Sequence, residues 1–287
     1  MRGVGATLVV ATEALESGEL TRRDIRRRYT MVYRNVYVPN GAELTAADRA
    51  RAAWLWSGRR ATLTGHCAAA VLGSRWIAPD APVEIAHSRR PAARGMIARC
   101  NNFRDDEVCV VDAMRCTTVA RTAYDLGRRL TEQMGVIRLD ALLNATGVAP
   151  PAVDAVAARH SGARGIRRLR RTMTLVDAGA ESPQETRLRL LLVRSGLPRP
   201  VTQIPVHDDR GRVVRRIDLG WPDIRVGVEY DGEQHFTNPD DYAGDIERLE
   251  FLAARGWLIV RVSATQLRYR RAEIIDRVMK ARRVHGC

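Results

Sequence analysis

Apolar positions are most regularly patterned in the last third of the chain. Short runs of β-branched and aliphatic residues, bounded by turn residues, are typical of strands in a sheet. Longer segments with apolar residues three or four positions apart indicate helices before, between and after these runs. The expected order is α-β-β-β-α-β-α, over residues 186–195, 201–206, 213–219, 225–230, 241–254, 257–263 and 265–283.

The first 45 residues predict a short helix–turn–helix–hairpin unit. Thr21 followed by Asp24 is typical of a helix N-cap with an acidic first turn, so a helix is expected over residues 22–29. β-Branched and aromatic residues at 31–39, interrupted by Arg34-Asn35, predict two strands joined by a tight turn. The hairpin would form the wing of a winged-helix-like, DNA-binding unit.

The whole chain is therefore expected to combine α+β and α/β domains. The first would span residues 1–45 and the second, a mixed α/β domain, residues 46–178. The second would end in a basic tail at residues 161–171, which is either a linker or a helix end. The third domain, residues 179–287, would begin at the small residues Ala178-Gly179-Ala180.

Length and composition are those of a globular protein. The 287 residues are enough to bury a core without disulfides or a structural metal, and 45% of them are hydrophobic. The five cysteines include no C-x-x-C pair, which argues against a disulfide framework and a zinc ribbon. No apolar run approaches a bilayer span, and acidic residues directly follow the first apolar run, so neither a membrane segment nor a signal peptide is expected. These features predict a cytoplasmic protein.

The net charge is strongly positive. Lys+Arg number 47 against 33 Asp+Glu, a net +14, and Lys280 is the only lysine. Residues 1–178 carry 28 basic and 17 acidic side chains (+11), whereas residues 179–287 carry 19 and 16 (+3). This excess favours a nucleic-acid partner, with DNA expected; a GC-rich coding bias is the alternative source of arginine. The residues expected to contact phosphates form two basic clusters, Arg22, Arg23, Arg26, Arg27 and Arg167, Arg168, Arg170, Arg171.

The strongest candidate for chemistry is an acidic group at Asp218, Glu229 and Asp231. If residues 221–224 form the bend between two paired strands, Asp218 lies directly opposite Glu229, and Asp231 shares the face of Glu229. Three converging carboxylates favour a divalent cation with oxygen ligands, Mg²⁺ or Mn²⁺, which would activate water for phosphodiester hydrolysis. The alternative is a chance group of surface acids on an edge hairpin.

Two further residues extend this candidate site. His235, just after the strand, is placed to act as a general base or to pass a proton to a leaving oxygen; a solvated loop histidine is the alternative. Glu185 is either a fourth oxygen ligand or the end of a capping box that begins at Ser182, with Pro183 in the first turn.

The last third of the chain contains a series of motifs in a definite order. They are the helix of Glu185, Arg216-Ile217-Asp218, Val228-Glu229-Tyr230-Asp231-Gly232 with His235, Asp245, Arg248 and Leu252, and Gly256-Trp257-Leu258-Ile259-Val260-Arg261-Val262. Through them, residues 181–283 resemble the Vsr-like branch of the PD-(D/E)xK restriction-endonuclease-like superfamily. The resemblance implies a restriction-endonuclease-like core, with Asp218 and Glu229 as metal ligands and Glu185 and His235 in support of catalysis.

One position departs from the superfamily pattern. The lysine expected two residues after the second acid is Asp231 in this chain. Vsr-like members also lack that lysine, and His235 or Gln234 would stand in for it. The alternative is a domain that has kept its fold and lost its activity.

The first 145 residues carry a second set of motifs. They are Leu20-Thr21-Arg22-Arg23, Asn35-Val36-Tyr37-Val38-Pro39, and the runs TGHCAAAVLG at residues 64–73 and TTVARTAYDL at residues 117–126. These resemble the AbiEi family of type IV antitoxins. The resemblance implies an N-terminal winged helix that binds DNA, and a cognate toxin as a partner.

Two functions from different classes follow. The first is a DNA-binding, metal-dependent endonuclease, and the second is an antitoxin-like transcriptional regulator whose nuclease-like domain is inactive. A partner-binding protein that does not bind nucleic acid is a third possibility. The oligomeric state and the choice between DNA and RNA stay open.

Overall fold

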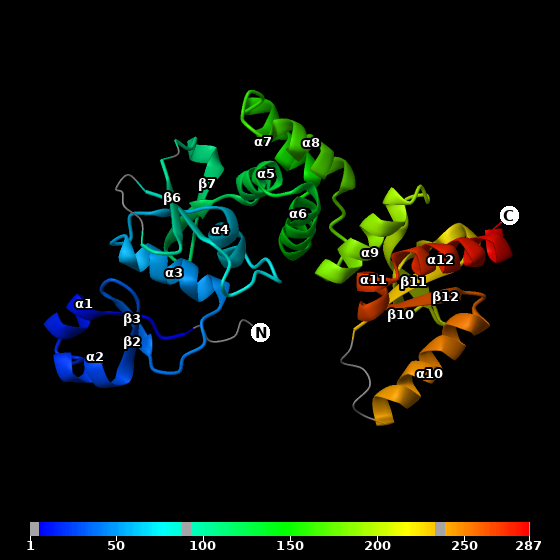
Figure 1. The fold of residues 1–287 in the computed structure, drawn as a ribbon, viewed down its shortest axis with the longest axis horizontal. Helices are drawn as coiled ribbons and strands as arrows, with labels where there is room; N and C mark the ends of the chain where they lie inside the picture. The colour runs from blue at the N-terminus through cyan, green and yellow to red at the C-terminus, as the bar shows by residue number, and fades with distance from the viewer. Residues whose placement is uncertain (1–5, 88–92, 101, 233–238, 287) are drawn as a thin grey trace. The chain divides into compact units, whose positions relative to one another are not determined.

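The chain forms two compact units in the computed structural model, which describes residues 6–87, 93–100, 102–232 and 239–286. Unit 1 is Met1–Val176 and unit 2 is Asp177–Cys287. Helices and sheets occur in both units (Figure 1), which confirms the expected mixture of α and β structure. None of the described helices is both long enough and apolar enough to cross a membrane.

Unit 1 begins with a small sheet and two helices. The elements are β1 (Val9–Val10), α1 (Ala11–Glu16), α2 (Arg22–Arg28), β2 (Tyr29–Tyr33) and β3 (Val36–Pro39). The strands are antiparallel in the order β1-β3-β2. The predicted cap of α2 is confirmed, since Thr21 Oγ1 accepts the Asp24 N–H at 3.2 Å and Asp24 accepts the Thr21 N–H at 2.9 Å. The predicted turn at Arg34-Asn35 joins β2 to β3.

A five-stranded sheet forms the middle of unit 1. Its strands, in the order β6-β5-β4-β8-β7, are β4 (Thr62–Leu63), β5 (Val83–Ala86), β6 (Met96–Arg99), β7 (Val108–Val111) and β8 (Met114–Thr117). Helices α3 (Ala46–Trp56) and α4 (Gly65–Val71) pack on it. Leu63 and Ile85 of the sheet share one hydrophobic core with Tyr33 and Val36 of the hairpin. The hairpin of residues 29–39 and the sheet therefore bury apolar side chains together.

Four helices complete unit 1. They are α5 (Val119–Arg129), α6 (Glu132–Thr146), α7 (Pro150–Arg159) and α8 (Ile166–Leu175). The basic tail, expected as a linker or a helix end, begins α8. Gly165 precedes this helix with φ of 88°, and a Cβ there would lie 2.2 Å from the carbonyl oxygen of Arg128. Only glycine permits this close approach of α8 to the end of α5.

A buried ion network joins the elements around α5. Asp125 is fully buried and accepts from three guanidinium groups, those of Arg121 at 3.0 Å, Arg128 at 2.7 Å and Arg129 at 3.0 Å. Arg121 also pairs with Glu107, which is fully buried at the end of a short 3₁₀ helix. The three contacts of Asp125 all lie within α5 and offset charge on this helix, because buried charges are tolerated only when paired. The Arg121–Glu107 pair is the contact of this network that joins α5 to the 3₁₀ helix.

Unit 2 is built on a four-stranded sheet in the order β12-β11-β10-β9. Its elements are α9 (Pro183–Arg194), β9 (Val201–His207), β10 (Val213–Trp221), η2 (Pro222–Ile224), β11 (Val226–Asp231), α10 (Pro239–Ala254), β12 (Leu258–Ser263), α11 (Ala264–Tyr269) and α12 (Arg271–Gly286). Leu188 of α9 and Ile274 of α12 pack with Val228, whereas Leu252 of α10 packs with Ile217. Figure 1 shows α10 on the side of the sheet away from α9 and α12.

The end of the chain differs from its prediction. One helix was expected over residues 265–283, but the helix breaks at Arg270, between α11 and α12. The Ser263 side chain accepts the Gln266 N–H at 3.3 Å and Gln266 accepts the Ser263 N–H at 3.1 Å, so α11 is separately capped. The break allows Leu267 and Ile274 to enter the same core, and the apolar spacing alone does not reveal it.

Candidate functional site

Asp218 of β10 and Glu229 of β11 lie beside each other on antiparallel strands. The register pairs Leu219 with Val228 and Trp221 with Val226, which places Asp218 opposite Glu229 one step further along. The strands therefore pair as the sequence predicted from a bend at residues 221–224. The Asp218 carboxylate also accepts the N–H of Tyr230 at 2.9 Å. The sheet therefore fixes the Asp218 carboxylate directly and places Glu229 beside it.

Glu185 brings a third carboxylate from the first turn of α9. Ser182 caps this helix, since its hydroxyl accepts the Glu185 N–H at 3.1 Å. The Glu185 carboxylate accepts the Glu181 N–H at 2.9 Å and the side-chain amide of Gln203 at 3.1 Å, both through Oε2. Glu185 is buried. The Ser182 hydroxyl therefore caps the helix, but the Glu185 carboxylate accepts the Glu181 N–H and not the Ser182 N–H that a capping box requires. The same carboxylate acts on the pKa of Asp218, which places it near the acidic pair.

The pKa of Asp218 reflects its burial and the nearby carboxylates. The pKa of Asp218 is raised to about 7 from its ordinary 3.8, and burial is the largest cause. The negative charge of Glu185 adds to this rise, and that of Glu229 adds less. The Tyr230 N–H and the positive charge of Arg248 oppose this rise. The three acids therefore interact through space, and a cation placed among them would be favoured.

Arg248 and Gln203 belong to the site, although neither was among the predicted site residues. Arg248 donates from Nη2 to Glu229 at 2.7 Å and also contacts the backbone carbonyl of Arg216 at 3.3 Å. The spacing of Arg248 and Leu252, four residues apart on α10, was a signal that Arg248 faces the sheet. Gln203 gave no comparable signal, because a polar residue in a short strand is common.

The remaining predicted residues of the acidic site lie differently. Asp231 is paired with Arg261 of the neighbouring strand, at 2.6 Å. Its charge is thus compensated within the sheet, and the carboxylate that raises the pKa of Asp218 most is that of Glu185. His235 lies outside the described residues.

The donor set fits a hard divalent cation held by few protein ligands. Within residues 6–87, 93–100, 102–232 and 239–286, no group of three or more His, Cys, Asp or Glu side chains is arranged to hold a metal ion. Mg²⁺ commonly binds through one or two carboxylates and completes its octahedron with water and substrate phosphates. Asp218 and Glu229 supply such a pair, in a place where their own charges repel.

The raised pKa of Asp218 predicts that Asp218→Asn stabilises unit 2 above neutral pH. Below about pH 4 the carboxyl is protonated in both the folded and the unfolded chain; as the pH rises towards 7 the unfolded chain releases this proton and the folded chain retains it, so stability falls. At pH 8 the variant avoids this cost, and we expect a gain on the order of 2–4 kcal/mol. The amide oxygen of the substituted side chain would still accept the Tyr230 N–H.

Urea unfolding of the full chain in EDTA, followed by tryptophan fluorescence at pH 5 and pH 8, measures this difference. Asp223→Asn, at an exposed turn position after β10, is the matched control and should change little at either pH. A variant Asp218→Asn that is no more stable than the parent at pH 8 would contradict the prediction.

The predicted phosphate-binding arginines are all exposed, but some of them also contact other groups of unit 1. Arg22, Arg23, Arg26 and Arg27 of α2 are exposed, and no ion pair to them is present in the described part of the chain. The four arginines of α8, Arg167, Arg168, Arg170 and Arg171, are also exposed. Arg168, however, donates to the carbonyls of Arg129 and Leu130 at the end of α5, and Arg171 lies 3.7 Å from Glu132. Of the two clusters, the α2 cluster has its charges less engaged by the rest of the fold.

Comparison with known proteins identifies relatives without a described function. Two uncharacterised proteins of Mycobacterium tuberculosis, MT2308 of strain CDC 1551 / Oshkosh and Rv2248 of strain ATCC 25618 / H37Rv, are each 30% identical to this chain over 170 residues. The match covers 59% of this chain and 62%, less than two thirds, of each relative. No family model matches the chain, and no solved structure matches it.

Proposed function

We propose that this chain binds DNA and hydrolyses phosphodiester bonds with a divalent cation at the acidic site of unit 2. The observation that carries the proposal is the approach of Asp218, Glu229 and Glu185 in a buried place, where burial first and then the charges of Glu185 and Glu229 raise the pKa of Asp218 to about 7. A fold gains nothing from such repulsion, whereas a cation site requires it.

The residues of the chain have separate tasks in this reaction. Asp218 and Glu229 would hold Mg²⁺ or Mn²⁺, which when bound lowers the pKa of a water and offsets charge on the phosphate. Gln203 holds Glu185 in place. In hydrolysis the water gives up one proton and its oxygen bonds to phosphorus, one P–O ester bond breaks, and the leaving oxygen takes up one proton. His235 remains the proposed proton donor.

Arg248 supports catalysis in a chain that lacks the superfamily lysine. The only lysine, Lys280, is on α12. Arg248 places a positive charge 2.7 Å from Glu229 and keeps a second contact to a backbone carbonyl. It is thus placed to contact a phosphate oxygen when Glu229 is engaged by a cation.

The topology of each unit supports the proposal. In unit 2, antiparallel β9, β10 and β11 are followed by α10 and by β12, which runs parallel to β11. This is the arrangement expected of a restriction-endonuclease-like core. In unit 1, α1 and α2 follow β1 along the chain and precede the β2–β3 hairpin. Strand β3 of this hairpin pairs with β1, so the sheet order is β1-β3-β2. This order supports a winged-helix-like unit, with α2 as the helix that contacts DNA.

A regulator without nuclease activity is the second candidate function. The observation that favours it is the ion pair between Arg248 and Glu229, which compensates the charge of Glu229 without any cation. In this case unit 1 would bind an operator, the acidic site would be a remnant, and a cognate toxin would be the protein partner.

Plasmid nicking by the purified full chain separates the two functions. A nuclease nicks supercoiled DNA in Mg²⁺ or Mn²⁺ and stops when EDTA is added. A regulator retards DNA in a gel at low salt and cuts it with neither metal. Absence of both activities would contradict the proposal that DNA is the partner.

DNA binding by α2 predicts a defined effect of removing its charges. Arg23→Gln/Arg27→Gln is expected to weaken binding to any DNA sequence and to reduce the slope of log K against log salt concentration by about two, because two phosphate contacts are lost. Fluorescence anisotropy in EDTA measures affinity and slope together. The double variant Arg51→Gln/Arg75→Gln removes the same charge from exposed positions outside α2 and is the control. An equal effect in both would show that only net charge matters.

A further inference from the structure

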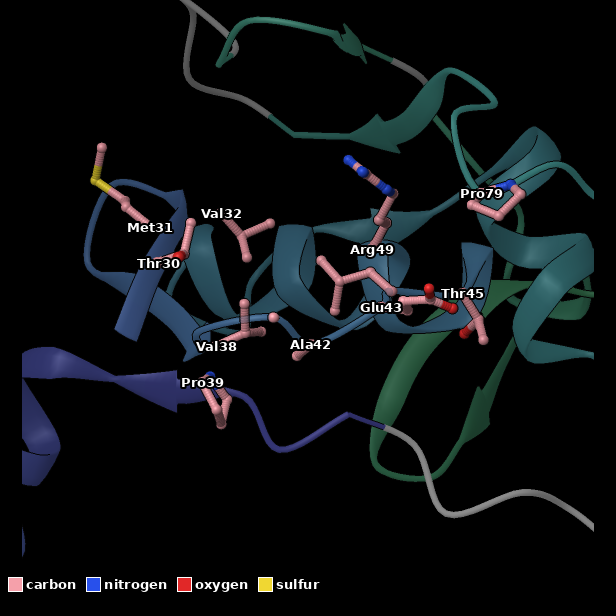
Figure 2. A pocket seen from close by; sticks show the side chains of 12 residues that line it. Thr30, Met31, Val32, Val38, Pro39, Ala42, Glu43, Thr45, Arg49 and Pro79 are labelled. Carbon is pink, nitrogen blue, oxygen red and sulfur yellow. The ribbon is translucent and has the colours of Figure 1, made fainter. Parts of the chain in front are cut away.

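Unit 1 contains a cavity of about 660 Å³ between the β2–β3 hairpin and α3. Figure 2 shows the side chains around it: Val32 and Val38 come from the hairpin, Arg49 from α3, and Pro79 from the loop after α4. The volume lies within the usual range for small-molecule pockets. None of the acidic residues of unit 2 lines it, so it is a separate site.

Arg49 gives this cavity its chemistry. The Nε of Arg49 is buried and has no hydrogen-bond partner in the described part of the chain. No carboxylate of the described residues forms an ion pair with this guanidinium either. A buried guanidinium N–H without an acceptor costs free energy, and a carboxylate matches the paired donors of this group. The unpartnered group therefore points to an anionic ligand.

The rest of the lining defines the kind of anion. Val32, Val38 and Leu44 provide apolar surface for a hydrocarbon or aromatic body. The lining also includes Glu43, which is exposed, so one positive and one negative side chain border the space. A polyanion such as a nucleotide would be repelled by Glu43, whereas a single negative charge can be placed on Arg49.

We propose that this cavity binds an amphipathic monocarboxylic acid, with its carboxylate on Arg49 and its apolar body against the hairpin. The site is independent of the proposed nuclease or regulator function. Because residues of both β2 and β3 line the cavity, a bound ligand would contact both strands of the hairpin.

Binding of the fluorescent monoanion anilinonaphthalene sulfonate to the full chain tests the proposal. We expect a saturable increase in fluorescence that phenylpropionate reverses and that its uncharged amide, phenylpropanamide, does not. Arg49→Met should weaken dye binding by about tenfold or more, because it removes a charge-assisted hydrogen bond and keeps the apolar volume. Arg49→Lys should retain part of the affinity.

Two further variants make the test decisive. Arg51→Met, at an exposed position on the same helix, lowers the net charge equally and should leave the saturable component unchanged. Ala42→Phe, at an exposed position that lines the cavity, should block the site without touching Arg49, and it decides the matter if Arg49→Met does not fold. Unchanged binding in Arg49→Met or in Ala42→Phe, an equal loss in Arg51→Met, or equal displacement by the acid and the amide would overturn the proposal.

Discussion

Glu229→Gln is expected to reduce metal-dependent plasmid nicking by roughly 10³-fold or more. The substitution keeps the size of the side chain and removes the negative charge that would hold the cation beside Asp218. An amide is a weak ligand for Mg²⁺, so both the charge offset on the phosphate and the activation of water are lost together. Nicking rates at saturating Mg²⁺ and Mn²⁺, for the parent and the variant at equal protein concentration, measure the effect.

The geometry allows this loss to be distinguished from unfolding. The amide oxygen of the substituted side chain can still accept from Arg248, so the contact that links β11 to α10 is retained. Glu250→Gln, at an exposed position on the same helix as Arg248, removes an equal charge and should cut normally. Salt-sensitive DNA binding in EDTA should be the same in all three proteins. Cleavage that survives in Glu229→Gln would place the active site elsewhere and leave the acidic group as a structural feature.

The sequence predicted those features of the fold that depend on near neighbours. The caps at Thr21 and Ser182 are short-range patterns with one favoured geometry, and both side chains cap their helices. The capping box is complete at Thr21, whereas at Ser182 the Glu185 carboxylate accepts the Glu181 N–H instead of closing the box. The pairing of Asp218 with Glu229 was also accessible, because one bend fixes the register of two strands and the alternation of their side chains. In contrast, β4 has two residues, and no periodic pattern can occur in so short a strand.

Contacts between distant segments could not be obtained in the same way. Gln203 reaches Glu185 across 18 positions, and Arg248 reaches Glu229 across 19. The four-residue spacing of Arg248 and Leu252 indicated that Arg248 faces the sheet, but it did not identify Glu229 as the partner. Nothing in the local sequence distinguishes Gln203 from a solvated side chain, since amide residues are exposed in most proteins. For the same reason, the sequence around Asp125 is that of an ordinary polar position of a helix, although this side chain is fully buried.

The burial of Asp125 leads to the largest expected effect on stability. Asp125→Ala is expected to destabilise unit 1 by about 3–5 kcal/mol, because the guanidinium groups of Arg121, Arg128 and Arg129 lose their shared carboxylate. Arg121 keeps its pair with Glu107, whereas the two others are left with longer contacts, Arg128 to the carbonyl of Arg164 at 3.3 Å and Arg129 to Glu84 at 3.7 Å. Positive charges held close together in a water-poor interior then repel one another.

Thermal unfolding of the full chain, followed by circular dichroism, should show the unit 1 transition lowered by on the order of 10 °C. Asp154→Ala, at an exposed position of α7, removes the same charge from the same unit and should shift this transition by no more than a degree or two. Asp125→Asn should fall between the two, since an amide oxygen can accept one of the three guanidinium contacts without offsetting their charge. If Asp125→Ala were as stable as Asp154→Ala, the arginines would be satisfied by water, and Asp125 would not be what offsets their charge on α5.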